Sequence, residues 1–375
     1  MDSSEIFHRL RLIRSTNVGP VSYYRLMQKY GTAKIALRAL AELANAEGRR
    51  RPEIASEISI EQEMETVEKL GGKYLFHDQH TYPAILSELR NAPPVLIWRG
   101  DISLIQRPAV AIVGARNASA ASRSFARILA DELTEHGVSI VSGLARGIDT
   151  AAHQGSLKRA TVAVIAGGAD TYFPPENQEL QEQIANEGLL LSEQPPGTEP
   201  HARHFPFRNR IIAGLAMGTV IVEAAPKSGS LITARLAAES GRHVMAVPGS
   251  PMDPRSQGCN GLIKDGASLI QSAEDVLELI RPMDERMVQK SITTKQPAAM
   301  VAGMQVTRKA DKSGSKQQMQ ANILDLLSTT PVTVDELVRQ SHIDPAEMQL
   351  ILLELELAGK LTRSAGARVA LSSIH

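Results

Sequence analysis

The sequence predicts an α/β fold, with a mostly parallel sheet buried between two layers of helices and a small domain on each side. Three observations support this prediction. Strand-sized apolar runs alternate with amphipathic stretches from Ala109 onward, helical periodicity precedes them, and a structured segment follows a polar stretch over 283–317. The 375 residues, 43% of them hydrophobic, suffice for one large core and one or two small ones.

The central domain, expected over 76–282, contains six apolar runs of strand length. They are AVAIV, VSIVS, TVAVIA, LLLS, TVIVEA and HVMAVPG, and Ser268–Ile270 offers a seventh. Helical stretches over Ser122–His136, from Ile148 and over Glu176–Glu187 separate the first runs. Because parallel strands need crossover connections, which are usually helices, this alternation predicts βαβ units and a parallel sheet.

Residues 1–75 are expected to form a small helical domain. Apolar positions recur at helical spacing on both sides of Asn17–Pro20. A Gly-Pro turn between two helices fits a helix–hairpin–helix, whose backbone amides can hold a DNA phosphate. It also fits a tight turn without a ligand, and this interpretation is favoured because such turns are common.

Residues 283–317 are expected to be a flexible linker, and 318–375 a winged helix. The linker stretch buries too little apolar surface to fold alone. Three helical patterns then precede a hairpin that turns at Ala365-Gly366. Thr333 is expected to cap the second helix and Asp344-Pro345 to open the third.

The third helix of this C-terminal domain is acidic. It carries Asp344, Glu347, Glu354 and Glu356, and only Gln349 is a plausible base reader. Carboxylates on that face would repel phosphates. The domain is therefore expected to bind protein, either another domain of this chain or a partner, rather than duplex DNA.

Charge and cysteine content narrow the class of protein. The 41 basic and 41 acidic residues give no net charge, so any nucleic-acid site must be a local basic pocket. Cys259 is the only cysteine, which excludes a disulfide framework. No uncharged apolar run approaches the roughly 18 residues of a membrane span, and the first residues lack a signal-peptide core. A cytoplasmic protein without membrane contacts is expected.

Four segments at or near the expected strand ends carry the candidate site. In open α/β sheets, ligands bind outside the carboxyl ends of the strands. Glycines admit a close backbone approach, helix N-termini attract anions, and guanidinium groups match phosphate. The candidates are Gly114, Arg116 and Ser119 in the first segment; Gly143 and Arg146 in the second; Arg208, Asn209 and Arg210 in the third; and Lys227, Ser228, Gly229, Ser230 and Thr233 in the fourth.

The segments leave some alternatives open. The first has neither the GxGxxG nor the P-loop pattern, and a structural turn with a solvated Arg116 would also explain it. Arg208 and Arg210 lie two apart and cannot share a helical face. At least one of them is therefore expected in the cleft, whereas the other can pair internally.

Catalysis is not expected. Asp149 and His153, four residues apart, could act as an acid/base pair with Ser142 as nucleophile, but a structural pair is favoured. His201 and His204 lack companion ligands at metal-site spacing, and Cys259 is expected to be inert. We therefore expect no catalytic residue, no metal and no cofactor.

Seven stretches within Tyr82–Ala267 together resemble the DNA-processing A family, also called DprA or Smf. They are YPAIL, VGARNAS, SGLARGIDTAAH, FPFRNRIIAGL, SGSLITA, VPGS and GLIKDGA. The resemblance implies an extended Rossmann-like fold that binds single-stranded DNA and hands it to the RecA recombinase in natural transformation and recombination. It also implies a sterile-alpha-motif-like N-terminal domain and a C-terminal winged helix, and a homodimer is expected.

One segment departs from that family's pattern. Phe173 stands where tyrosine is usual, and Pro175 stands where a DNA-contacting lysine can occur. The contribution of that lysine cannot be carried over to this chain. Lys227, Arg208 and Arg146 are the candidates to compensate.

The predicted mechanism is phosphate binding that positions a DNA backbone without reading its sequence. Aromatic residues make up 3% of the chain, so an extended stacking platform is not expected; Phe205 and Phe207 are the nearest candidates. One alternative is a phosphoribohydrolase acting on nucleoside monophosphates. The Ser228–Thr233 segment lacks the glycine pair of that class, and Glu239 lies too far along. The other alternative is an adaptor protein in which the terminal domains, and not the central domain, do the binding.

Overall fold

The computed structural model describes residues 2–45, 53–281, 323, 327, 332–341, 343–357, 360–364 and 368–371. It has two compact units, Met1–Glu61 with Ala298–His375, and Gln62–Pro297. The expected linker over 283–317 and the hairpin turn at Ala365-Gly366 lie outside the described residues. Among the helices that the structure describes, none is both long and apolar enough to span a membrane.

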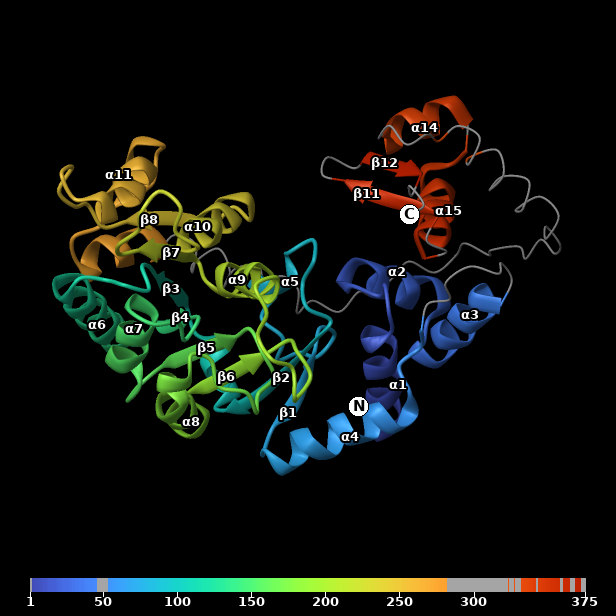
Figure 1. The fold of residues 1–375 in the computed structure, drawn as a ribbon, viewed down its shortest axis with the longest axis horizontal. Coiled ribbons are helices and arrows are strands. Elements are labelled where there is room, and N and C mark those ends of the chain that lie inside the picture. The colour runs from blue at the N-terminus through green and yellow to red at the C-terminus, as the bar shows by residue number, and fades with distance from the viewer. Residues whose placement is uncertain are drawn as a thin grey trace, which may run out of the picture. The chain divides into compact units, whose positions relative to one another are not determined.

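A nine-stranded sheet forms the centre of the larger unit (Figure 1). Its order is β1-β2-β6-β5-β4-β3-β7-β8-β9. Among the seven strands β3 to β9, every pair of neighbours is parallel, which confirms the predicted α/β class. The strands are β1 (Lys73–Phe76), β2 (Val95–Gly100), β3 (Ala109–Val113), β4 (Ser139–Ser142), β5 (Thr161–Ile165), β6 (Leu189–Ser192), β7 (Gly218–Ile221), β8 (His243–Ala246) and β9 (Ser268–Leu269).

Strands β1 and β2 were not expected from the sequence. Both are antiparallel additions at the β6 edge of the sheet. The region between them contains Pro83, Pro93 and Pro94, which hides the strand pattern because proline is rare within strands. The seventh apolar run, in contrast, does form a strand, β9.

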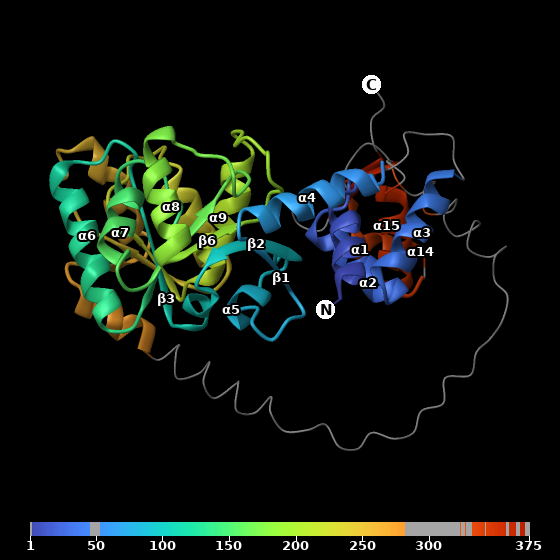
Figure 2. The same cartoon turned by 90° about the horizontal axis from the view of Figure 1, so that it is seen from below.

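Helices cover both faces of this sheet, and the view from below has α6, α7 and α8 in front of it (Figure 2). Side chains alternate along β3, so Val110 and Ile112 pack toward α6, while Ala111 and Val113 pack toward α9. Both faces of β3 are therefore buried, as a parallel sheet requires. One layer contains α6 (Ala120–Glu135), α7 (Ile148–Ser156) and α8 (Gln178–Glu187); the other contains α5 (Ala84–Ser87), α9 (His204–Leu215), α10 (Ser230–Glu239) and α11 (Gln257–Lys264).

In the smaller unit, N-terminal helices surround an apolar cluster that includes Leu12, Leu26 and Leu40. The turn expected at Asn17–Pro20 lies between α1 and α2, and Pro20 is the first residue of α2. The helices are α1 (Ser3–Arg14), α2 (Pro20–Tyr30) and α3 (Ala33–Asn45), and α4 (Glu57–Lys69) follows them.

The C-terminal part of that unit has the second and third helices and the hairpin strands expected of a winged helix, while the first expected helix, in the ANILDLL stretch, lies outside the described residues except for Ile323 and Leu327. Its three-stranded sheet has the order β10-β12-β11. The Thr333 hydroxyl accepts a hydrogen bond from the Glu336 amide at 3.3 Å, and Pro345 opens the third helix, as predicted. The described elements are β10 (Val332–Thr333), α14 (Val334–Ser341), α15 (Pro345–Leu357), β11 (Leu361–Ser364) and β12 (Arg368–Leu371).

Candidate functional site

The strand order of the larger unit creates a crevice next to β3. From β3 the chain runs outward through β4, β5 and β6 on one side, and it returns through β7, β8 and β9 on the other. The loops that follow β3 and β7 therefore lead to opposite sides. Ligands of open α/β sheets bind in the crevice that such a switch of direction leaves at the carboxyl ends of the strands.

A groove of about 520 Å³ occupies this position. All four predicted segments contribute to its wall, because the loops after β3, β4 and β7 and the start of α9 meet there; the second segment contributes Ala145 and Asp149. The predicted residues in its wall are Gly114, Arg116, Arg208, Asn209, Lys227, Ser228, Gly229, Ser230 and Thr233. The structure thus brings together residues that lie more than a hundred positions apart in the chain.

A smaller pocket of about 80 Å³ adjoins the groove. Gly143 and Arg146, the candidates of the second predicted segment, line it together with Phe173. Arg116, Phe205 and Arg208 border both cavities. The two hollows therefore share a wall, to which Arg116 contributes.

Arg116 and Lys227 are the exposed cations of the groove. Within the described part of the chain, neither side chain forms an ion pair. The Arg116 guanidinium lies 5.2 Å from the centroid of the Phe205 ring, a cation–π distance. This contact holds the arginine at the groove while its hydrogen-bond donors remain available to an anion.

Arg146 has a different electrostatic environment. Its guanidinium pairs with the carboxylate of Glu176, and both side chains are about half exposed. The pair lowers the pKa of Glu176, chiefly through the hydrogen bond from Arg146. Part of the positive charge at the smaller pocket is therefore neutralised by the residue that follows Pro175.

Arg208 and Arg210 are both buried, and they separate as their spacing predicts. Arg208 borders the cavities and donates hydrogen bonds to the carbonyl oxygens of Gly143 and Val164, the latter at 2.6 Å. Among the described residues its Nε has no hydrogen-bond partner. Arg210 lines neither cavity and pairs with Glu193 at 2.5 Å. Arg208 can therefore contact a ligand, whereas Arg210 stabilises the fold through its ion pair with Glu193.

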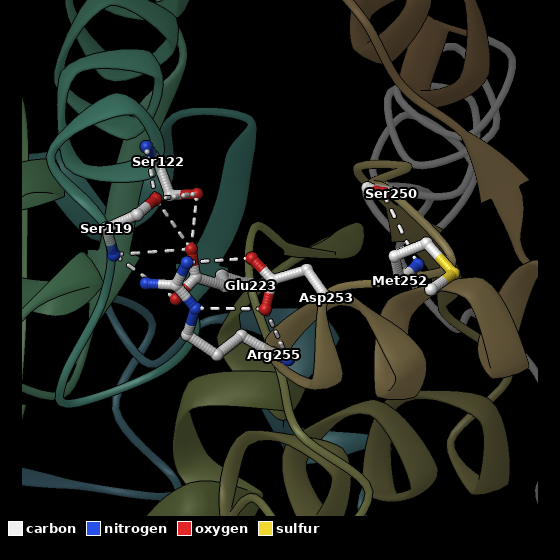
Figure 3. A network of polar contacts seen from close by, with 7 residues as sticks. All are labelled: Ser119, Ser122, Glu223, Ser250, Met252, Asp253 and Arg255. Atoms are coloured by element: carbon white, nitrogen blue, oxygen red, sulfur yellow. Dashed lines mark hydrogen bonds and ion pairs between the residues drawn. The ribbon is translucent and has the colours of Figure 1, made fainter.

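Glu223, just after β7, organises the start of α6 (Figure 3). Its carboxylate accepts a hydrogen bond from the Ser119 amide at 3.2 Å and from the hydroxyls of Ser119 and Ser122, both at 2.7 Å. The Ser119 hydroxyl also accepts from the Ser122 amide and so caps α6. An internal carboxylate thus occupies the anion-attracting end of α6, and Ser119 lines neither cavity.

Figure 3 also shows Arg255 and Asp253 beside this carboxylate. The Arg255 guanidinium donates to Asp253 at 2.7 Å. Glu223 raises the pKa of Arg255 further through its negative charge, after the larger effect of Asp253. The buried carboxylate is therefore surrounded by hydrogen-bond donors and lies in the field of a cation, which offsets its loss of hydration.

The residues with possible acid, base or nucleophile roles are buried and engaged. The Asp149 carboxylate accepts from the Gly143 amide at 3.1 Å. His153 is fully buried; its Nε2 accepts from the Leu144 amide, and Nδ1 contacts the Thr161 hydroxyl. Burial and the nearby Arg208 lower the pKa of His153 to about 3, so the ring is neutral. These contacts fit the favoured structural interpretation of the pair.

Two further candidates for catalysis, the Ser142 hydroxyl and the Cys259 thiol, are also buried. The Ser142 hydroxyl is buried and donates to the Ile112 carbonyl at 2.7 Å. Cys259 is fully buried, and burial raises the pKa of its thiol to about 11. Neither group reaches the groove.

Two glycines of the site are explained by internal packing. A Cβ atom at Gly143 would lie 2.1 Å from Nη1 of Arg208, and one at Gly114 would lie 2.6 Å from Cγ1 of Ile148. Glycine at these positions admits the neighbouring side chain. Gly229, in contrast, has open space where a Cβ would be, so a ligand can approach its backbone.

The fold and the groove define a Rossmann-like protein with an anion-binding surface at its switch point. Residues 73–281 match the DNA recombination-mediator protein A family, 3–66 a DprA-like N-terminal HHH domain, and 307–367 a DprA winged-helix domain. The chain therefore belongs to the DprA/Smf family. The N-terminal match supports a helix–hairpin–helix at Asn17–Pro20, and the sequence-based preference for a plain turn is therefore not supported.

Several relatives align over much of the chain. DNA processing protein DprA of Streptococcus pneumoniae is 47% identical over 52% of this chain and 70% of its own length. Protein Smf of Synechocystis is 33% identical over 98% of this chain and 99% of its own. The X-ray structure of the S. pneumoniae protein has a TM-score of 0.64 at 36% identity, covering 74% of this chain and 98% of that one.

A second solved structure concerns single-stranded DNA. DNA processing protein A of Helicobacter pylori, whose structure describes a single-stranded DNA binding mode, has a TM-score of 0.51 at 31% identity. It covers 56% of this chain and 96% of that one.

Three acidic residues of the site were missed by sequence reasoning. Glu223, Glu193 and Glu176 each hold a predicted cationic or helix-capping group. Glu193 directly follows β6, and Glu223 lies two residues after β7. Their position at strand ends was the signal in the sequence that could have pointed to them. Their partners lie 17 to 104 residues away, so no local spacing could have paired them.

Proposed function

We propose that this protein binds single-stranded DNA along the groove through backbone phosphates, and that it delivers the strand to the RecA recombinase during DNA uptake and recombination. Catalysis has no part in this function. The observation that carries the proposal is the pair of exposed cations, Arg116 and Lys227, in one groove with the hydroxyl-rich loop after β7.

The chemistry of the groove suits successive phosphates. Arg116 offers a planar set of donors, Lys227 a compact charge, and the segment around Gly229 free backbone approach. Ser228 and Ser230 share a hydrogen bond at 2.7 Å and present hydroxyl oxygens at the same wall. Such contacts position a strand without reading its bases, so binding should tolerate any sequence.

Phe205 is the aromatic group available to this groove. Its ring contacts Arg116 and lies 5.4 Å from the Phe173 ring, centroid to centroid. Phe207, the other sequence candidate, is 58% exposed. One or two rings are too few for a continuous stacking platform, so we assign most of the affinity to charge.

Delivery to RecA and assembly as a homodimer rest on family membership. The relatives are named for DNA processing, and the H. pylori structure is described for single-stranded DNA. We propose RecA and a second copy of this chain as partners, as the resemblance to the family implies. Equilibrium sedimentation tests the dimer, and assembly of RecA on strands pre-coated with single-strand-binding protein tests the delivery.

The alternative of a nucleoside-monophosphate hydrolase has little support from the geometry. Asp149 lines the groove, but its carboxylate is buried and accepts a hydrogen bond from the Gly143 amide. His153 and Ser142 are buried, hydrogen-bonded and outside both cavities, and burial keeps His153 from acting as an acid near neutral pH. Glu239 lies at the end of α10, in the turn farthest from the groove wall that Ser230 and Thr233 line. Release of base from a nucleoside monophosphate by the pure protein, abolished by Asp149→Asn, would overturn the non-catalytic proposal.

A titration with labelled oligonucleotides tests the binding. We expect single strands of different sequence to bind with similar affinity, more tightly than a duplex of equal length, and with affinity that falls as salt rises. Equal or tighter binding of the duplex would contradict the proposal.

A further inference from the structure

The third helix of the winged helix, α15, has apolar side chains on two faces. Met348, Ile351 and Leu352 pack into the core of the winged helix. Leu353 belongs to a different cluster, that of the N-terminal helices, and is 2% exposed. A helix with apolar side chains on two faces needs a packing partner on each of them. In a winged helix standing alone, Leu353 would lie on the outside.

Polar contacts surround this apolar one. Lys29, near the end of α2, pairs with the Glu354 carboxylate at 2.6 Å, and the side chains are 22% and 6% exposed. Arg25, one turn earlier, donates to the Gln349 side chain at 3.3 Å. Burial lowers the pKa of Lys29, but its contacts with Glu354 and Tyr30 outweigh this and leave the pKa raised. A charge as buried as Glu354 needs such a partner.

Two groups that could touch DNA, Gln349 and Arg363, are thus used inside the protein, whereas Arg368 of β12 is exposed. Gln349, the plausible base reader of α15, is held by Arg25. Arg363 of β11 pairs with Glu356 at 2.8 Å. The acidic third helix is therefore complementary to a basic helix of the same chain.

We infer that the partner of the winged helix is the N-terminal helical domain, which covers the α15 face that winged helices commonly present to the major groove. Leu353 supplies the apolar anchor and Lys29–Glu354 the ion pair that sets the register. This closed arrangement keeps the winged helix from binding duplex DNA through α15. The inference is independent of what the groove binds.

Zero-length carbodiimide cross-linking of the full chain tests the contact, because it joins only amines and carboxylates already in contact. We expect tryptic fragments joined through Lys29 and Glu354. Lys29→Arg keeps the charge but removes the reactive amine, so it should abolish this product. The Lys69–Glu65 pair, 2.7 Å apart on α4, should still cross-link and serves as the internal control.

Charge reversal separates docking from misfolding. Lys29→Glu or Glu354→Lys alone should abolish the cross-link, and the double reversal should restore it between the exchanged residues. A mixture of ¹⁴N- and ¹⁵N-labelled protein should give products within one label only. Failure of the Lys29–Glu354 product while Lys69–Glu65 forms, or products that join the two labels, would overturn the inference.

Duplex binding by the full chain tests the consequence. With α15 covered, Gln349→Ala should leave duplex affinity unchanged. A loss of about tenfold, the size expected when a base-reading side chain is removed, would overturn the proposed occlusion.

Discussion

The carboxylate of Glu223 accepts hydrogen bonds from both the amide and the hydroxyl of Ser119, at 3.2 and 2.7 Å. These contacts fix the end of the loop that carries Arg116. Because the carboxylate already fills the N-terminal end of α6, a phosphate is directed to the exposed cations of the groove. The structure and charge of this loop are therefore set by Glu223, a residue that follows another strand, β7.

Replacing Glu223 should destabilise the larger unit. Glu223→Ala leaves the donors of Ser119 and Ser122 without their acceptor, and we expect a loss of about 1–3 kcal/mol in the free energy of unfolding. Denaturant unfolding measures it. Ser122→Ala, which removes one donor and leaves the acceptor, is the matched control and should cost less. Equal stability of Glu223→Ala and the parent would show that the network contributes nothing.

Removing the charge of Glu176 should strengthen DNA binding. The carboxylate neutralises Arg146 in the free protein, so Glu176→Gln leaves that guanidinium to a phosphate. We expect a tighter single-strand complex and a salt slope steeper by up to about one unit. Glu179→Gln, one turn further on and outside both cavities, is the control for a general change of charge. Weaker binding of Glu176→Gln would count against Arg146 as a contact.

His153 should make the fold sensitive to acid. Its pKa is about 3 in the folded state and 6.5 unperturbed, so the unfolded chain binds more protons between these values. The free energy of unfolding should therefore fall as pH drops from about 6.5 toward 3, by up to about 1.4 kcal/mol per pH unit. His153→Gln should flatten this dependence; an unchanged slope would contradict the assignment.

Asp149 also contributes to the pH dependence of the free energy of unfolding, with the opposite sign. Burial raises its pKa in the folded state, against the effect of Arg208, so its contribution is present at low pH and is lost as pH rises. The difference between the parent and His153→Gln, rather than the parent curve alone, therefore isolates the histidine.

The local pattern of apolar and polar residues was enough to predict much of the fold. The six apolar runs and the seventh became strands because each is short, apolar and bounded by helical segments. The prolines before Val95 concealed β1 and β2, and no local pattern reveals an antiparallel pair added at an edge. Gly-Pro at Gly19-Pro20 predicted a turn, but it could not tell a helix–hairpin–helix from a plain one.

The cations and small residues of the site could be predicted from the sequence, because they follow parallel strands whose carboxyl ends lie at the same edge of the sheet. What could not be predicted is which polar groups the protein uses internally. Ser119 and Arg210 have the same local pattern as Ser228 and Arg208, yet their hydrogen bonds go to Glu223 and Glu193. Those acceptors lie just after β7 and β6, and only the folded sheet brings them near their donors.

The most direct test of the central claim is the salt dependence of single-strand affinity for the variant Arg116→Ala/Lys227→Ala. Each residue is taken to contact one phosphate, so we expect weaker binding for every sequence and a salt slope reduced by about two units. Arg127→Ala, an exposed arginine of α6 outside both cavities, should leave slope and affinity unchanged. An unchanged slope and affinity in the double variant would contradict the account and favour binding by the terminal domains.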